Sequence, residues 1–175
     1  MRISESLLQE LEQEAQTTRR VLERVPQEHL EWRPHPKAMT LGQLAMHVAT
    51  IPGGVAAFAE ADSKEVPSFP QPTVDDVRQL LPLLDESVAT ARVVLSPMTD
   101  ARMQATWRLV SGDQTIMALP RMAFLRTVML NHWYHHRGQL STYLRHLGVA
   151  LPSIYGPSAD ENPFVTQPAA ATAPA

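Results

Sequence analysis

The chain has 175 residues, a formal net charge of −3 and no cysteine. This length suits one domain with a sizeable core, and balanced charge without a dense basic run argues against nucleic acid as a partner. No apolar stretch is expected to cross a membrane and the acidic start lacks the pattern of a secretory signal, so we expect a cytoplasmic protein. Without cysteine, imidazole and carboxylate groups are the only strong ligands for a transition metal.

Apolar residues at helical spacing predict two helices in the first third of the chain. The first begins near Ser4 and ends at or just before Pro26. The second begins after Thr40, whose hydroxyl can cap a helix, and continues through Pro52, which could kink it. His47 belongs to the apolar stripe of this second helix, so its imidazole is expected to face the core.

Two further helices are predicted in the second half of the chain. The third begins near Thr73, with Asp76 as an acidic partner in its first turn, and ends at Leu95. The fourth is the longest and runs from about Pro120 to Gly148, with a proline suited to its first turn and a glycine suited to its end.

Between the third and fourth helices, residues 106–110 and 114–117 alternate around a Ser-Gly-Asp turn and could form a short hairpin. Four amphipathic helices in one chain predict an all-α fold, a four-helix bundle with long connections, over residues 1–165. The alanine- and proline-rich residues 166–175 are expected to form a disordered tail.

The most informative motif is N-H-W-Y-H-H-R-G-Q-L, residues 131–140. His132 and His136 are four residues apart on the predicted fourth helix, so their imidazoles share one face and can bind one metal ion. Together with His47 they would form a site of three imidazoles. Three protein ligands leave positions open for water or substrate, as in catalytic zinc sites. His135 is a competitor for the place of His136, because residues three apart are also neighbours on a helix.

Simpler explanations stay open at this point. A histidine on an apolar face can bind a backbone carbonyl, and a histidine pair can arise on a histidine-rich surface. A zinc protease is disfavoured, because Trp133 follows His132 where the H-E-x-x-H motif has its glutamate. Asn131 and Gln139 could orient ligands or be ordinary polar residues of a helix. Arg137 could contact an anionic thiol or a substrate carboxylate, although an exposed ion pair is expected.

Residues 23–49, 120–148 and 151–161 resemble the DinB family of the DinB/YfiT-like metalloenzyme superfamily, through the ordered motifs W-R-P-H-P, L-A-M-H, N-H-x-x-H-H-R-G-Q-L and Y-G-P-S-A-D-E. The resemblance implies a four-helix bundle in which one histidine of the second helix and two of the last bind a divalent metal. The matching positions are His47, His132 and His136. Zinc or nickel is expected first, with manganese or iron as alternatives, and the resemblance also implies a homodimer.

The wider superfamily includes transferases and an isomerase that use low-molecular-weight thiols such as bacillithiol, mycothiol or glutathione. The resemblance therefore favours an enzyme that joins an external thiol to a small electrophilic substrate, in detoxification or stress response. The alternative is a metal-binding stress-response protein without catalytic activity. A purely structural helical protein, which would bind no metal, is the third hypothesis.

Overall fold

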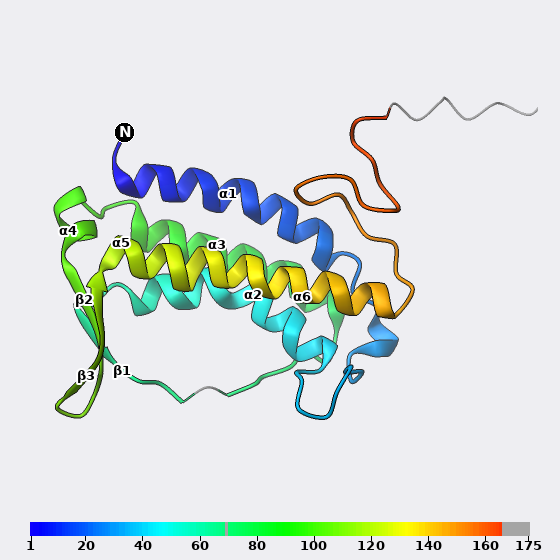
Figure 1. The fold of residues 1–175 in the computed structure, drawn as a ribbon, viewed down its shortest axis with the longest axis horizontal. Helices are drawn as coiled ribbons and strands as arrows, with labels where there is room; N and C mark the ends of the chain where they lie inside the picture. The colour runs from blue at the N-terminus through cyan, green and yellow to red at the C-terminus, as the bar shows by residue number, and fades with distance from the viewer. Residues whose placement is uncertain (69, 166–175) are drawn as a thin grey trace, which may run out of the picture.

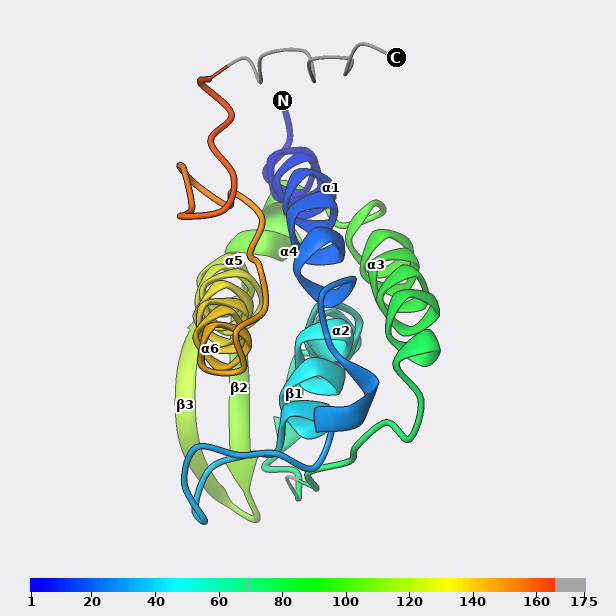
Figure 2. The ribbon, with the colours of Figure 1, turned by 90° about the vertical axis from the view of Figure 1, so that its right-hand side faces the viewer.

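The computed structural model describes residues 1–68 and 70–165, so the predicted tail lies outside the described part. Long helical segments make up most of the fold and lie side by side (Figures 1 and 2). They are α1 (Ile3–Leu22), α2 (Leu41–Phe58), α3 (Leu80–Leu95), and a composite last helix of α5 (Arg121–Phe124), η3 (Leu125–Asn131) and α6 (His132–His146). Because α2 contacts α1, α3 and α6, it lies at the centre of the core.

Short elements lie in the connections between the long helices. They are the 3-10 turns η1 (Gln27–His29) and η2 (Val77–Gln79), the helix α4 (Asp100–Gln104), and the strands β1 (Ser63–Glu65), β2 (Thr106–Ser111) and β3 (Gln114–Pro120). The antiparallel pairing of β2 with β3 confirms the predicted hairpin, and β1 adds a parallel edge strand in the order β1-β2-β3. The mostly helical prediction is confirmed, but the sheet shows that all-α was wrong. The three residues of β1 are too few to give a strand pattern in the sequence.

The predicted start of the second helix is confirmed and that of the third is wrong. Thr40 caps α2 in a reciprocal pair: the Gln43 N–H donates to its hydroxyl at 3.2 Å, and its own N–H donates to the Gln43 side chain at 2.9 Å. In contrast, α3 begins at Leu80 and not near Thr73. The Asp76 carboxylate accepts the Arg78 N–H at 2.8 Å and caps the short turn η2 instead.

Helix α2 is long and apolar enough to meet the composition of a membrane-crossing helix. Buried residues make up 56% of it, however, and the helix packs against three other long helices. A central core helix of a folded domain has the same character. Its apolar composition therefore reflects its position in this core.

The last helix is not a uniform α-helix, because η3 is π-helical and ends directly before His132. A π-turn contains more residues than an α-turn and changes which face the following residues occupy. The fully buried residues of α6 are Trp133, Arg137, Leu140 and Leu144. His132 and His136 are half-buried on the flank of this stripe, and His47 is half-buried on α2. The prediction that these histidines face the core is therefore wrong, because they lie at its edge.

Candidate metal centre

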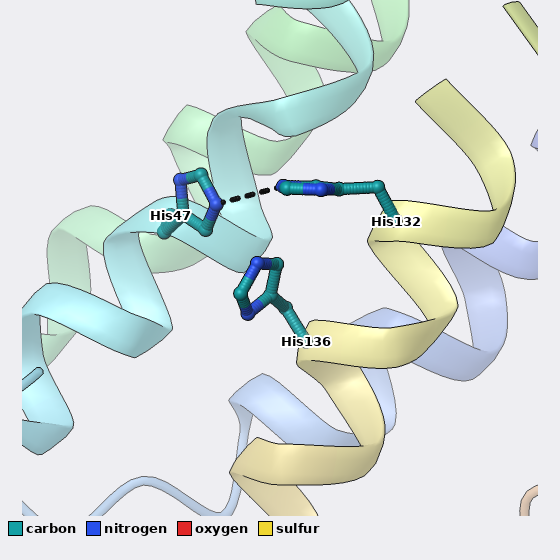
Figure 3. A group of neighbouring side chains, drawn as sticks. All are labelled: His47, His132 and His136. Carbon is teal, nitrogen blue, oxygen red and sulfur yellow. Dashed lines mark hydrogen bonds between the residues drawn. The ribbon is translucent and has the colours of Figure 1, made fainter. Parts of the chain in front are cut away.

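Three histidines meet between α2 and α6. Figure 3 shows His47 on α2 facing His132 and His136, which project from successive turns of α6. One ring nitrogen from each residue lies within 4.8 Å of the others, and the Nε2 atoms of His47 and His132 are 3.1 Å apart. Among the described residues, no carboxylate joins this group, so its possible ligands are three imidazoles. The sequence-predicted trio therefore comes together from positions far apart in the chain.

The separation of the first two nitrogens fits a shared divalent ion. Two imidazole nitrogens that each lie about 2.1 Å from one metal are roughly 3.0 Å apart at a right angle and roughly 3.4 Å apart at a tetrahedral angle. The observed 3.1 Å between His47 Nε2 and His132 Nε2 falls between these values. A donor set of three imidazoles suits zinc, nickel and iron more than calcium or magnesium, which prefer oxygen. The residues present therefore fit a transition-metal ion.

The surroundings keep the three imidazoles neutral, which is the form that binds a metal. Burial lowers the pKa of His47, and the neighbouring His132 lowers it further. Burial also lowers the pKa of His132, with a further contribution from His135. Burial lowers the pKa of His136 to about 4, with smaller contributions from the other histidines and an opposing one from Gln139. At neutral pH the cluster therefore offers lone pairs without first releasing protons.

Gln139 orients the third imidazole. Its side-chain oxygen lies 2.7 Å from His136 Nδ1, so in the neutral ring Nδ1–H donates to this oxygen and Nε2 carries the lone pair. Figure 3 shows that the His136 ring has one nitrogen directed toward the other two rings. An oxygen acceptor on the second nitrogen is the usual partner of a metal-binding histidine. Of the two sequence alternatives for Gln139, the orienting role agrees with this contact.

Two other polar residues of the motif, His135 and Asn131, lie outside the cluster and are exposed. His135 is exposed and does not belong to the histidine cluster, although its ring lies 5.0 Å from that of His136. The geometry therefore favours His136 over His135 as the third member. Asn131 is also exposed, at the junction of η3 and α6.

Trp133 anchors α6 against α2 beside the cluster. Its indole is fully buried, and Nε1–H donates to the backbone carbonyl of Val48 at 2.7 Å. In an uninterrupted helix this carbonyl would accept the N–H four residues later, but that residue is Pro52, which has none. Pro52 thus frees the acceptor that Trp133 uses. The sequence predicted a packing residue at Trp133 but not this partner.

Arg137 lies one turn after Trp133 on the same buried face of α6 and contacts α1, so the predicted exposed ion pair is wrong. Its side chain is 1% exposed and lies 2.6 Å from the carboxylate of Glu14 on α1. It also donates to Thr18 at 3.1 Å and to the hydroxyl of Tyr155. Because Glu14 lies 123 residues away in the sequence, local patterns could not reveal this pair.

A mostly helical fold with three clustered imidazoles defines a protein that can hold a transition metal between two helices. The DinB family model matches residues 1–167, and the chain belongs to the DinB family. It is 28% identical over 160 residues to the uncharacterized protein YrdA of Bacillus subtilis. The matched region covers 88% of this chain and 89% of that protein.

Two solved structures share the fold. A DinB-like protein from Bacillus cereus has a TM-score of 0.70 at 24% identity, covering 86% of this chain and 97% of the other. A DinB-like protein from Bacillus subtilis has a TM-score of 0.64 at 17% identity, covering 85% and 96%. The long helices and their order are therefore those of DinB-like proteins.

Proposed function

We propose that this chain is a divalent-metal-dependent transferase that joins an external thiol to a small electrophilic substrate. His47, His132 and His136 would hold the metal, with zinc or nickel as the first candidates and manganese or iron as alternatives. The observation that carries the proposal is the convergence of their ring nitrogens within 4.8 Å. In this proposal the long helices form a four-helix bundle, in which such sites are built from facing helices.

The absence of cysteine determines where the nucleophile comes from. The chain has no thiol of its own, so the sulfur must belong to a second small molecule. A bound divalent metal would lower the pKa of such a thiol, so that thiolate forms at neutral pH. The three neutral imidazoles supply ligands without adding negative charge, and Gln139 holds the His136 ring in the required tautomer.

The ligand set leaves coordination positions for reactants. Three protein ligands are typical of catalytic metal sites, whereas structural zinc usually has four. The proposal also includes a homodimer, which rests on the family resemblance alone, and the cytoplasmic location expected from the sequence.

Metal analysis of untagged protein tests the proposal directly. We expect about one divalent ion per chain. His47→Ala or His132→Ala should lower the metal affinity by more than about 100-fold, which is the largest loss usual for residues that only contact a metal ligand. The matched control is His135→Ala, which removes an exposed histidine of the same motif and should retain the metal. Thiol transfer, assayed with 2-mercaptoethanol and iodoacetamide, should be lost in the same two variants and kept in the control.

Two results would contradict the proposal in different ways. Stoichiometric metal without transfer, tested with several thiols, would leave the alternative of a non-catalytic metal-binding protein. Untagged protein that binds no divalent ion would exclude both functions and leave a structural helical protein.

A further inference from the structure

An apolar cleft of about 290 Å³ lies between α2, the β2–β3 hairpin and the π-helical segment η3. Its walls include Val55, Phe58, Trp107, Leu109, Phe124 and Val128. The rings of Trp107 and Phe124 stack with centroids 3.8 Å apart and form one side of it. No charged side chain lines the cleft among the described residues. A concave apolar surface of this size suits a small uncharged ligand.

The cleft follows the same pair of helices as the histidine cluster. On α2, His47, Ile51, Val55 and Phe58 lie along one face, so the cleft begins about two turns beyond His47. On the facing helix, Val128 lies about one turn before His132. Figure 1 shows that α2 and the last helix run in opposite directions, so both helices lead from the histidines toward the hairpin. The cleft and the cluster therefore lie along the same pair of helices, with the cleft on the hairpin side of the histidines.

We propose that this cleft binds the apolar part of the electrophilic substrate and directs its reactive carbon toward the three histidines. The inference rests on the proposed function and assigns its substrate class: an uncharged electrophile with one ring or a short aliphatic chain. The volume supports this class, because a cavity of about 150 Å³ already holds benzene. A peptide segment or a charged sugar would find neither the space nor polar partners.

A concrete member of this class is 1-chloro-2,4-dinitrobenzene. The thiol would release its proton to solvent as the thiolate forms. The thiolate sulfur would then form a bond to the ring carbon that carries chlorine, the carbon–chlorine bond would break, and chloride would leave with its electron pair. The reaction is a substitution without oxidation or reduction, so it requires no further reactant. Iodoacetamide also exchanges a halide for the thiolate sulfur, by direct displacement of iodide from its saturated carbon, but it has no ring to occupy the cleft.

Gly54 offers a way to fill the cleft without moving the backbone. It lies on α2 in the cleft wall, and a Cβ added there would meet no atom within 4 Å. The adjacent Gly53 differs, since a Cβ there would lie 2.7 Å from the Ser87 carbonyl. Gly54→Leu should therefore fold and reduce the cleft. Ala57→Leu, at an exposed position of the same helix outside the cleft lining, is the matched control.

We expect Gly54→Leu to lower kcat/KM for 1-chloro-2,4-dinitrobenzene with 2-mercaptoethanol by about tenfold, and to leave the rate with iodoacetamide within about twofold. Ala57→Leu should change neither. A second measurement needs no catalysis: 1,3-dinitrobenzene, which lacks the leaving chloride, should shift the indole N–H resonance of Trp107 in wild-type protein without added metal. In Gly54→Leu, at least tenfold more 1,3-dinitrobenzene should be needed to produce the same shift.

The two measurements separate this inference from the proposed function. If iodoacetamide reacts but Gly54→Leu affects neither the aromatic substrate nor the Trp107 resonance, the cleft assignment is wrong and the transferase proposal stands. An equal loss with both electrophiles would also overturn the assignment. If neither electrophile reacts, yet 1,3-dinitrobenzene shifts Trp107 in wild-type and not in Gly54→Leu, the cleft is a ligand site and the transferase proposal fails.

Discussion

Gln139 is the residue that decides which nitrogen of His136 faces the cluster. Its oxygen accepts from Nδ1 at 2.7 Å, and without it the ring could rotate or adopt the other tautomer. His47 and His132 have each other as neighbours at 3.1 Å, whereas the orientation of His136 depends on this local contact. The third imidazole is therefore the most sensitive member of the trio to a change outside the cluster.

Replacing this acceptor should weaken metal binding without unfolding the protein. We expect Gln139→Ala to lower the affinity for zinc by about 10–100-fold, and Gln139→Glu, which keeps an acceptor oxygen, to restore most of it. Competition with a chromophoric chelator would measure both. Thr142→Ala, at an exposed position one turn further along α6, serves as the control. Equal affinity in Gln139→Ala and wild-type protein would show that the contact does not orient the ligand.

At this scale the sequence was informative about the histidines and silent about their supports. The i, i+4 spacing predicted that His132 and His136 share a face, and the helical position of His47 predicted a third partner. Arg137 was misjudged because nothing near it in the sequence indicates the buried carboxylate of Glu14. A charged residue is usually exposed unless paired, and the pair here is a tertiary contact.

Among the elements, α2 and α6 are joined by a hydrogen bond that a proline makes available. The Val48 carbonyl has no intrahelical donor because Pro52 occupies the position four residues later, and the Trp133 indole takes its place at 2.7 Å. An unpaired buried carbonyl is unfavourable, so each of these residues gives the other a structural role. This hydrogen bond therefore joins α2 to α6 directly beside His47 and the other two histidines.

A double-mutant cycle can measure this relationship. Trp133→Phe should reduce the free energy of unfolding by about 1–3 kcal/mol, because it leaves the Val48 carbonyl unpaired and removes part of a buried ring. In a Pro52→Ala background the same change should cost about 0.5–1.5 kcal/mol less, since the alanine N–H can bind that carbonyl. Urea unfolding of the four proteins provides the values. Strictly additive effects would mean that Pro52 and Trp133 are not coupled.

The elements also show where local sequence patterns stop being sufficient. Thr40 and Gln43 form a capping box, and both the cap and the helix after it were predictable from neighbouring residues. Asp76 has the same kind of sequence signal but caps a 3-10 turn, because the helix begins later at Leu80. The π-helical turn of η3 has no local signature, and it shifted the buried face of α6 to Trp133 and Arg137.

For the whole molecule, the neutral histidine cluster should make stability depend on pH. The pKa of His136 is lowered to about 4 and those of His47 and His132 are lowered as well, mainly by burial. In the unfolded chain these groups titrate near 6.5, so between these values the unfolded state binds more protons than the folded state. The free energy of unfolding is therefore highest above pH 6.5 and decreases as pH falls toward 4.

Metal-free protein should accordingly be less stable at pH 5 than at pH 7.5, and urea unfolding at the two values would measure the difference. His136→Ala should reduce that difference, because it removes the histidine with the largest shift. Carboxylates with lowered pKa, such as Glu10 beside Arg126, lose their contribution only below their ordinary value of 4.5 and do not obscure this interval. An unchanged difference in the variant would show that the cluster does not cause the pH dependence.

The chain repeats one arrangement at both positions of α6 that belong to the cluster. His132 is followed by Trp133, which is fastened to α2, and His136 is followed by Arg137, which is fastened to α1. The buried face of α6 is therefore fastened to two different helices, while the imidazoles beside it stay half-buried. Loading an ion should then require side-chain rotation and little backbone ordering. Since three imidazoles suit several divalent metals, the ion found in such a site would reflect cellular supply more than selection by the protein.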